Sequence, residues 1–309
     1  MNEQRPRKVW RQVHGVLLLD KPDGMTSNTA LQKARRACSA AKAGHTGTLD
    51  PMATGLLPVL FGEATKFSHM LLDADKTYRA TLRLGSTTTT GDREGEVIVE
   101  RDVSCCEADV RAAAASFLGE IEQVPPMYSA LKHEGKALYD YARQGIEIER
   151  KSRRITIFEL EVESVALPDV TIRVRCSKGT YIRTLAEDIG NTLGCGAHLV
   201  ALRRIATGDL MLEHAISLAE LEALDEPLRE TRLLPPDSLL AHLPVVQLMG
   251  EMEQRFSHGN PVRMEQGGVP HGEVRVYGQH FMGLGRIRED DTLRAVRLVA
   301  WHGGPDVVA

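Results

Sequence analysis

Alternating apolar and polar positions predict strands at several places along the chain. From Tyr78 to Leu84 every second residue is apolar, and threonine or arginine stands between. This period of two predicts a strand with one buried face over 76–84. The same alternation recurs over 170–177, after an extended segment at 154–166, so we expect a hairpin that turns at Pro168-Asp169.

Apolar runs and helical periods predict further strands and helices in the N-terminal two thirds of the chain. The run 15–20 (GVLLLD) is typical of a buried strand and is followed by the turn residues of 21–24. Because several predicted strand pairs are joined by short turns, we expect an α+β fold with a mixed, largely antiparallel sheet flanked by helices. Further strands are expected at 56–61 and 198–205, and helices at 26–38, 63–75, 107–118, 135–144 and 180–193.

The character of the sequence changes after a break between Pro235 and Pro244. Beyond it the pattern predicts a small helix at 251–257 and strands at 273–277, 282–288 and 293–299. A unit this small supplies little core of its own, so we expect it to lean on the larger part. The expected domains are a basic flexible arm at 1–14, a large domain at 15–240 and a β-rich domain at 241–309.

Length and composition fit an ordinary globular protein. The chain has 309 residues with 42% hydrophobic and 26% charged residues, which suits about two domains. No apolar run approaches the roughly 18 residues of a membrane span, and the polar, basic first residues do not resemble a targeting signal. The five scattered cysteines suggest reduced thiols. We therefore expect a cytoplasmic protein without membrane contact.

The charge pattern leaves two interpretations open. The net charge of −4 argues mildly against nucleic-acid binding. Basic residues nevertheless gather near the N-terminus, over 150–154 and at Arg203-Arg204, while acidic residues gather over 213–230. One face could meet a polyanion, or each cluster could simply be solvated surface.

One segment, 44–58 (GHTGTLDPMATGLLP), contains a candidate reactive group. Asp50 stands between a Gly/Thr-rich loop and a proline, directly before an apolar strand. A carboxylate on such a turn can be held rigidly in a cleft as a nucleophile or base, although Asp-Pro is also a common turn starter. Signatures of nucleotide, metal and serine-hydrolase sites are missing from the sequence, so any chemistry would depend on side chains alone.

Five segments in a fixed order resemble a known family. They are DKPDGMTS (20–27), GHTGTLDPMATGLLPV (44–59), DKTYRATLRLG (75–85), VPPMYSALKHEGKALYDYARQG (124–145) and SKGTYIRTLAEDIG (177–190). Together they closely resemble the bacterial tRNA pseudouridine-55 synthases of the TruB type. The C-terminal unit is similar to the small PUA-type RNA-binding domain of that family, whereas the N-terminal arm has no clear counterpart.

The resemblance implies that the protein converts uridine 55 in the T-loop of tRNA to pseudouridine. The N1–C1′ bond breaks, the detached uracil turns, and C5 bonds to C1′, so no redox cofactor and no metal is required. The implied essential group is an ionised Asp50. Addition to C6, attack on C1′ and removal of the 2′ proton remain open as its first step. We expect a monomer without an obligatory protein partner, which binds tRNA at the T-loop and T-arm; other RNA substrates remain open.

The same resemblance implies roles for six further residues. Without it, each of them fits an ordinary core, loop or surface position. The implied roles are ion pairing of Arg183 with Asp50, packing of Tyr78 on the target base, substrate contacts from Tyr181, His45 and Leu202, and packing of Lys21 behind Asp50.

Two other classes of function remain as alternatives. A non-catalytic RNA-binding or tRNA-folding protein on the same scaffold would not need Asp50. A glycosidase-like nucleoside hydrolase would need a second carboxylate as acid, and no companion is evident in the motif. Asp92, in a Thr/Gly-rich loop, is expected to be solvated.

Overall fold

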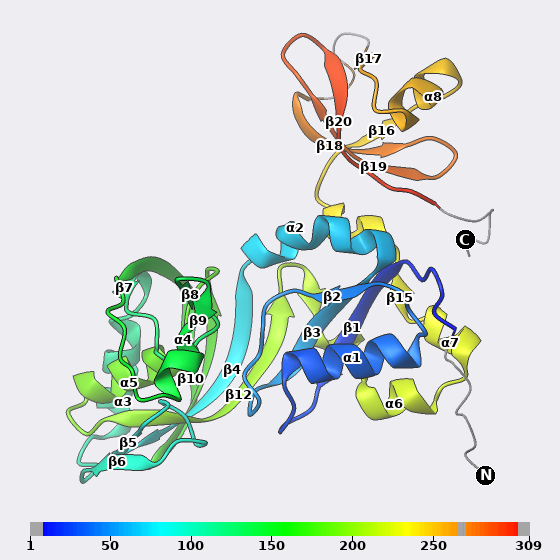
Figure 1. Ribbon diagram of the computed structural model, residues 1–309. Coiled ribbons are helices and arrows are strands. Elements are labelled where there is room, and N and C mark those ends of the chain that lie inside the picture. The colour runs from blue at the N-terminus through cyan, green and yellow to red at the C-terminus, as the bar shows by residue number, and fades with distance from the viewer. Residues whose placement is uncertain (1–8, 265–267, 269, 302–309) are drawn as a thin grey trace, which may run out of the picture.

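The computed structural model describes residues 9–264, 268 and 270–301. Within these residues the strands form one long mixed sheet, a separate smaller sheet in the C-terminal part, and two short hairpins (Figure 1). The α+β fold class expected from the sequence is confirmed. No helix in the described part of the chain has the length and apolar character that crossing a membrane requires.

The long sheet contains all the strands predicted for the large part of the chain. In chain order its strands are β1 (Gly15–Lys21), β2 (Ala43–His45), β3 (Thr54–Phe61), β4 (Lys76–Leu84), β7 (Gly119–Gln123), β10 (Arg153–Ala166), β11 (Asp169–Cys176), β12 (Ala197–Thr207), β13 (Leu210–Met211), β14 (Ile216–Ser217) and β15 (Leu233–Leu234).

The order of strands across the sheet is β14-β1-β3-β12-β4-β11-β10-β7. Strands β2, β13 and β15 pair with β3, β12 and β1 respectively. The β1–β14 and β3–β12 pairs are parallel and the other pairs are antiparallel. The sheet is therefore mixed and largely antiparallel, as expected. The hairpin predicted at Pro168-Asp169 is β10–β11, in which β11 pairs with β4 and β10 pairs with β7 on its other side.

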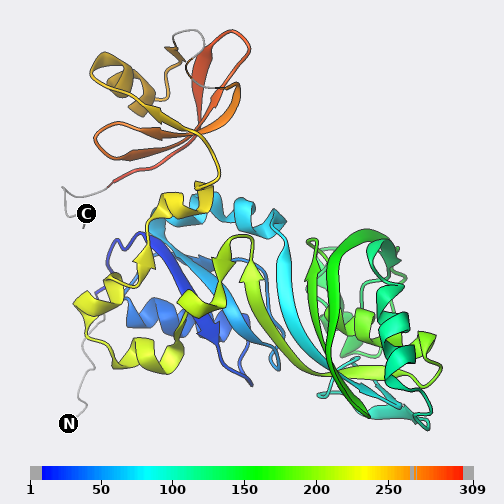
Figure 2. The same ribbon diagram turned by 180° about the vertical axis from the view of Figure 1, so that it is seen from behind.

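Helices cover the long sheet in two groups (Figures 1 and 2). α1 and α6 pack beside each other near β1 and β3, while α3 and α5 pack near β10 and β12. Thr26 caps α1 by accepting a hydrogen bond from the Thr29 amide. The helices are α1 (Ser27–Ala37), α2 (Ser68–Asp73), α3 (Glu107–Ala115), α4 (Leu138–Ala142), α5 (Ile182–Thr192), α6 (Leu218–Ala223), α7 (Glu226–Glu230) and α8 (Glu251–Ser257).

Two of the predicted helices differ from those observed. The segment 63–75 begins as a 3₁₀ helix, Gly62–Phe67, and becomes α2 only from Ser68. The expected helix at 135–144 is reduced to α4 because Glu134 and Gly135 both have positive φ. This turn joins the short strands β8 (Lys132–His133) and β9 (Lys136–Ala137), as positive φ at both central residues permits.

The end of the expected N-terminal arm is part of the fold. Residues 1–8, with Arg5, Arg7 and Lys8, lie outside the described residues. Arg11 donates its amide hydrogen to the Ser39 carbonyl and forms ion pairs with Glu226 and Glu230. Flexibility expected over 1–14 therefore does not extend to Arg11.

A smaller sheet follows the proline-containing break. Its strand order is β16-β18-β19-β20-β17, and α8 packs against it. Apolar side chains from this sheet and from α2 form a shared core, so the small unit leans on the larger one as expected. Its strands are β16 (Val245–Gln247), β17 (Val262–Arg263), β18 (Gly272–Tyr277), β19 (Phe281–Ile287) and β20 (Thr292–Leu298).

Candidate active site

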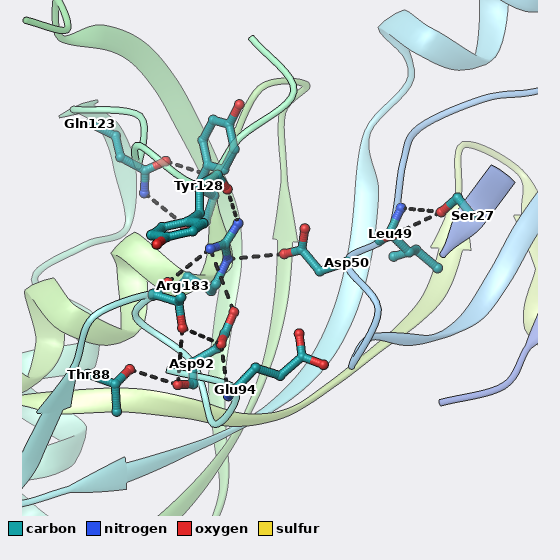
Figure 3. Close-up of polar contacts among 11 residues, drawn as sticks. Ser27, Leu49, Asp50, Thr88, Asp92, Glu94, Gln123, Tyr128 and Arg183 are labelled. Atoms are coloured by element: carbon teal, nitrogen blue, oxygen red, sulfur yellow. Dashed lines mark hydrogen bonds and ion pairs between the residues drawn. The ribbon is translucent and has the colours of Figure 1, made fainter. Parts of the chain in front are cut away.

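The loop between β2 and β3 holds Asp50 at the edge of a cavity. Leu49, directly before it, is buried and is fixed by Ser27, whose hydroxyl donates to the Leu49 carbonyl at 2.9 Å and accepts from its amide at 2.8 Å (Figure 3). On the other side, the Lys21 ammonium donates to the Pro51 carbonyl at 3.2 Å. The backbone on both sides of Asp50 is therefore anchored to β1 and α1.

Arg183, in the first turn of α5, faces Asp50 across the cavity (Figure 3). Its Nε lies 3.0 Å from Asp50 Oδ2, and its side chain is 5% exposed whereas that of Asp50 is 39% exposed. The guanidinium also donates to the Thr90 carbonyl at 2.9 Å and to the Tyr128 carbonyl at 2.6 Å. A planar guanidinium with several fixed acceptors is rigid, so Arg183 holds the carboxylate in one place.

Asp92 lies on the far side of Arg183, and the expectation that it is solvated is wrong. Its side chain is 5% exposed, and Oδ2 lies 3.6 Å from Arg183 Nη1. Its Oδ1 accepts hydrogen bonds from the Thr90 hydroxyl and the Glu94 amide. An aspartate that accepts a hydrogen bond from the amide two residues later forms a common turn, usually at the surface. The local sequence is therefore that of an ordinary turn, and it does not indicate that Asp92 is buried against Arg183 of α5.

The pKa of Asp50 is raised above its ordinary value. Burial is the largest cause, because it disfavours the charged form. Arg183 opposes this effect, while the charge of Asp92 adds to it. The ion pair expected from the sequence is therefore present, but it does not outweigh burial and the second carboxylate.

Five of the predicted site residues line one cavity of about 270 Å³, namely Asp50, Tyr78, Tyr181, Arg183 and Leu202. Tyr78 comes from β4 and Leu202 from β12, and both lie on the face of the sheet that α5 covers. The backbone of Tyr181, just before α5, is held by Gln123, whose side-chain oxygen accepts from the Tyr181 amide at 2.7 Å. Burial raises the pKa of both tyrosines, so their hydroxyls stay protonated at neutral pH.

Lys21 and His45 lie outside this set. Lys21 is fully buried behind the Asp50 loop, and burial lowers its pKa to about 8. His45 is in β2, paired with Val59, and its Nδ1 is buried without a hydrogen-bond partner in the described part of the chain. Burial and the neighbouring Arg204 lower its pKa, which favours the neutral ring.

Arg204 is a further residue of the cavity that sequence reasoning missed. The sequence indicates only a basic pair with Arg203, yet the Arg204 side chain is 1% exposed. The signal that could have found it is the period of two in β12, which places Arg204 on the same face as Leu202.

Comparison of the sequence with protein-family models shows which family the chain matches. Residues 35–182 match the N-terminal domain of the TruB family of pseudouridylate synthases. The chain belongs to this family. Residues 183–241 and 244–299 match two models of its C-terminal region, described as the tRNA pseudouridylate synthase B C-terminal domain and the pseudouridine synthase II TruB C-terminal domain. The protein is therefore a pseudouridine synthase, an isomerase.

Individual proteins agree with the family match. The tRNA pseudouridine synthase B of Burkholderia mallei is 57% identical, with 92% of this chain and 94% of the relative covered. That of Chromobacterium violaceum is also 57% identical, with 96% and 98% covered. Among solved structures, a chain of a Cbf5–Nop10–Gar1 complex aligns with a TM-score of 0.69 and 27% identity over 96% of this chain and 90% of that one. Another belongs to an H/ACA RNP bound to a substrate RNA containing 2′-deoxyuridine, with a TM-score of 0.64, 26% identity, and 92% and 84% covered.

Proposed function

We propose that this pseudouridine synthase isomerises uridine 55 in the T-loop of tRNA to pseudouridine, with Asp50 as its essential carboxylate. The observation that carries the proposal is the half-exposed carboxylate of Asp50 at a cavity, 3.0 Å from the buried guanidinium of Arg183. Relatives at 57% identity, named for tRNA, support the choice of substrate. The carboxylate acts in its ionised form. The reaction exchanges the N1–C1′ bond of uridine for a C5–C1′ bond, while C5 loses its hydrogen as a proton and N1 gains a proton.

The other cavity residues receive the target base. Tyr78 packs against it, Tyr181 and Leu202 contact it, and His45 occupies space near the flipped nucleotides. Lys21 supports the Asp50 loop from behind through its bond to Pro51. Extruding a base from a folded loop costs a few kcal/mol, and stacking of about 1–3 kcal/mol per base on aromatic rings offsets part of this.

The second carboxylate does not favour the nucleoside-hydrolase alternative. Asp92 is ion-paired and accepts hydrogen bonds from Thr90 and Glu94. It does not line the cavity. A general acid must reach the leaving group directly or through one water, whereas Asp92 is separated from Asp50 by Arg183. At this position the negative charge of Asp92 stabilises the positive charge of Arg183.

We further propose that residues 15–240 form the catalytic domain and residues 241–309 a PUA-like RNA-binding domain. The separation of the two sheets supports this division. The enzyme works as a cytoplasmic monomer on the T-arm of tRNA without a protein partner. Activity of the purified chain on a tRNA transcript, together with its mass in solution, tests this part.

Tritium release from tRNA containing 5-tritiated uridine tests the assignment of Asp50. We expect the wild-type chain to release tritium and Asp50→Asn to release none, because an amide cannot supply the ionised group. Binding of tRNA should survive, since the substitution keeps the size of the side chain. The matched control is Asp169→Asn, which alters an aspartate paired with Arg83 outside the cavity and should leave release unchanged.

A transcript with cytidine at position 55 tests the site of modification. Loss of release with this transcript supports position 55, whereas persistent release places the target elsewhere. Release by Asp50→Asn at the wild-type rate would falsify the role of Asp50. A wild-type chain that binds tRNA without releasing tritium would support the non-catalytic alternative.

A further inference from the structure

Arg204 is the largest side chain in the fully buried set, with 1% of its surface exposed. Its Nε donates to the Leu56 carbonyl at 2.7 Å and its Nη2 donates to the Gly47 carbonyl at 2.9 Å. No carboxylate in the described part of the chain forms an ion pair with it, whereas its neighbour Arg203 pairs with Asp20. Burying a charge without a counter-ion is costly, so this position calls for an electrostatic explanation.

Arg204 lies opposite Tyr78 in the sheet, on the same face. Arg204 in β12 and Tyr78 in β4 are directly paired in the sheet register, and both line the cavity with Asp50. Cross-strand partners on one face bring their Cβ atoms to about 4.5–5.5 Å. Burial raises the pKa of Tyr78, while the charge of Arg204 acts in the opposite direction.

The chemistry of the pair is directional. A guanidinium carries only donors, so the Tyr78 oxygen can only accept a hydrogen bond from Arg204, which leaves the tyrosine's own hydrogen to point elsewhere in the cavity. The positive charge of the buried guanidinium also stabilises any negative charge on that oxygen. Neither property would be available if the tyrosine hydroxyl faced a carbonyl or a carboxylate.

We propose that Arg204 is a positioning residue for the isomerisation, which orients the Tyr78 hydroxyl toward the target base and supplies the positive charge beside it. The inference rests on the proposed function and adds a residue to its machinery. It also explains why the cation is fixed to two backbone carbonyls, because these bonds hold the guanidinium at one place relative to Asp50.

A structural role is the alternative that an experiment must separate. The bonds to Gly47 and Leu56 connect Arg204 to the loop before Asp50 and to β3, so any substitution could shift the whole site. Arg204→Lys keeps the charge and most of the volume but loses the fixed fork of donors. If Arg204 acts through Tyr78, the effect of this change must depend on whether the hydroxyl of Tyr78 is present.

A double-mutant cycle measures that dependence. Single-turnover tritium release is compared for the wild type, Arg204→Lys, Tyr78→Phe and the double variant, at a temperature where circular dichroism shows all four folded. We expect Arg204→Lys to lower the rate at least about 10-fold in the wild type but less than about 3-fold in the Tyr78→Phe background. The affinity for tRNA should change less than about 3-fold. Arg203→Lys, on the opposite face of the same strand, is the matched control and should retain the wild-type rate.

The outcomes separate the inference from the proposed function. Equal losses in both backgrounds, or a wild-type rate for Arg204→Lys, overturn the inference while leaving the role of Asp50 intact. A wild-type chain without tritium release would instead overturn the proposed function.

A second measurement avoids altering Arg204. In the full-length protein with ¹⁵N-labelled arginine, Tyr78→Phe should shift the Arg204 side-chain resonance and speed its hydrogen exchange, and an unchanged resonance overturns the inference. This comparison decides the matter even where Arg204→Lys does not fold.

Discussion

Two charged neighbours of Asp50, the cation of Arg183 and the carboxylate of Asp92 behind it, act on its ionisation in opposite directions. Burial is the largest influence and raises its pKa, Arg183 lowers it, and Asp92 raises it again. In the proposed reaction the carboxylate of Asp50 acts in its ionised form, so turnover should fall as the pH decreases through this raised pKa. The acid limb of the pH–rate profile therefore lies above the ordinary value of about 3.9 for an aspartate.

Removing the charge of Asp92 tests this balance. Asp92→Asn eliminates a negative charge that disfavours ionisation of Asp50, so the acid limb of single-turnover tritium release should move to lower pH. The maximal rate should also fall, because Arg183 loses one of its anchors. Asp169→Asn, the surface control, should leave the limb unchanged. An acid limb that stays in place or moves to higher pH would show that Asp92 does not act on Asp50 through its charge.

Some residues of the site could be predicted from the sequence and others could not. The two groups differ in whether their place in the structure depends on distant segments. Asp50, Tyr78, Tyr181, Arg183 and Leu202 stand in recognisable segments, and the structure brings them to one cavity. Asp92 and Arg204 were missed because their burial depends on distant segments: Asp92 meets α5 through Arg183, and Arg204 meets Leu56 and Gly47. Local composition describes a polar loop and a basic pair, and it carries no information about such contacts.

At the scale of elements, long periodic segments were predicted best. The alternation over 76–84 corresponds to β4, and α8 has the predicted bounds. Short elements such as β7 and the β8–β9 hairpin were missed because a few residues carry no clear period. The 3₁₀ helix at Gly62–Phe67 begins with Gly62, whose φ is +51°, and the Thr65 hydroxyl donates a hydrogen bond to the Gly62 carbonyl. Such local bonds compete with regular helix and are not visible in an apolar pattern.

The packing of α5 on β12 sets the position of Arg183. A methyl group at Gly190 of α5 would lie 2.2 Å from the Ala197 backbone nitrogen, so Gly190→Ala must push the helix away from the sheet. We expect a loss of about 1–3 kcal/mol in the free energy of unfolding, as for other overpacked cores, and a drop in tritium release as Arg183 moves from Asp50. Urea denaturation and the release assay measure the two effects.

Asn191→Ala, one residue further along α5 and exposed, is the matched control and should change neither quantity. Wild-type stability and activity in Gly190→Ala would show that the contact between α5 and β12 does not determine the position of Arg183.

At the scale of the whole molecule, the small C-terminal sheet is attached to the large one by side chains and by backbone. Glu63 accepts a hydrogen bond from the Ala300 amide at 2.7 Å, and Lys66 donates to the Leu298 carbonyl at 2.8 Å. Tyr277 hydrogen-bonds Asp237 across the same boundary. These bonds surround an apolar core to which both sheets contribute, which fixes the C-terminal unit beside α2 (Figure 2).

Phe281 is the residue on which this attachment should depend most. It is 6% exposed, and the centroid of its ring lies 5.7 Å from the centroid of the Phe67 ring. Truncating a buried phenylalanine to alanine costs about 3–5 kcal/mol, and a small sheet with a limited core of its own cannot absorb that loss. Phe281→Ala should therefore raise amide hydrogen exchange in β18 and β19 while β4 and β11 stay protected.

The control for this experiment is Val296→Ala, on the exposed side of β20, which should leave exchange unchanged. Because Asp50 and Arg183 lie in the large domain, Phe281→Ala should keep its single-turnover rate on saturating tRNA and weaken binding instead. Equal loss of protection in both sheets would mean that the chain unfolds as one cooperative unit. The C-terminal sheet would then stabilise the fold around Asp50 and could not be assigned to RNA binding alone.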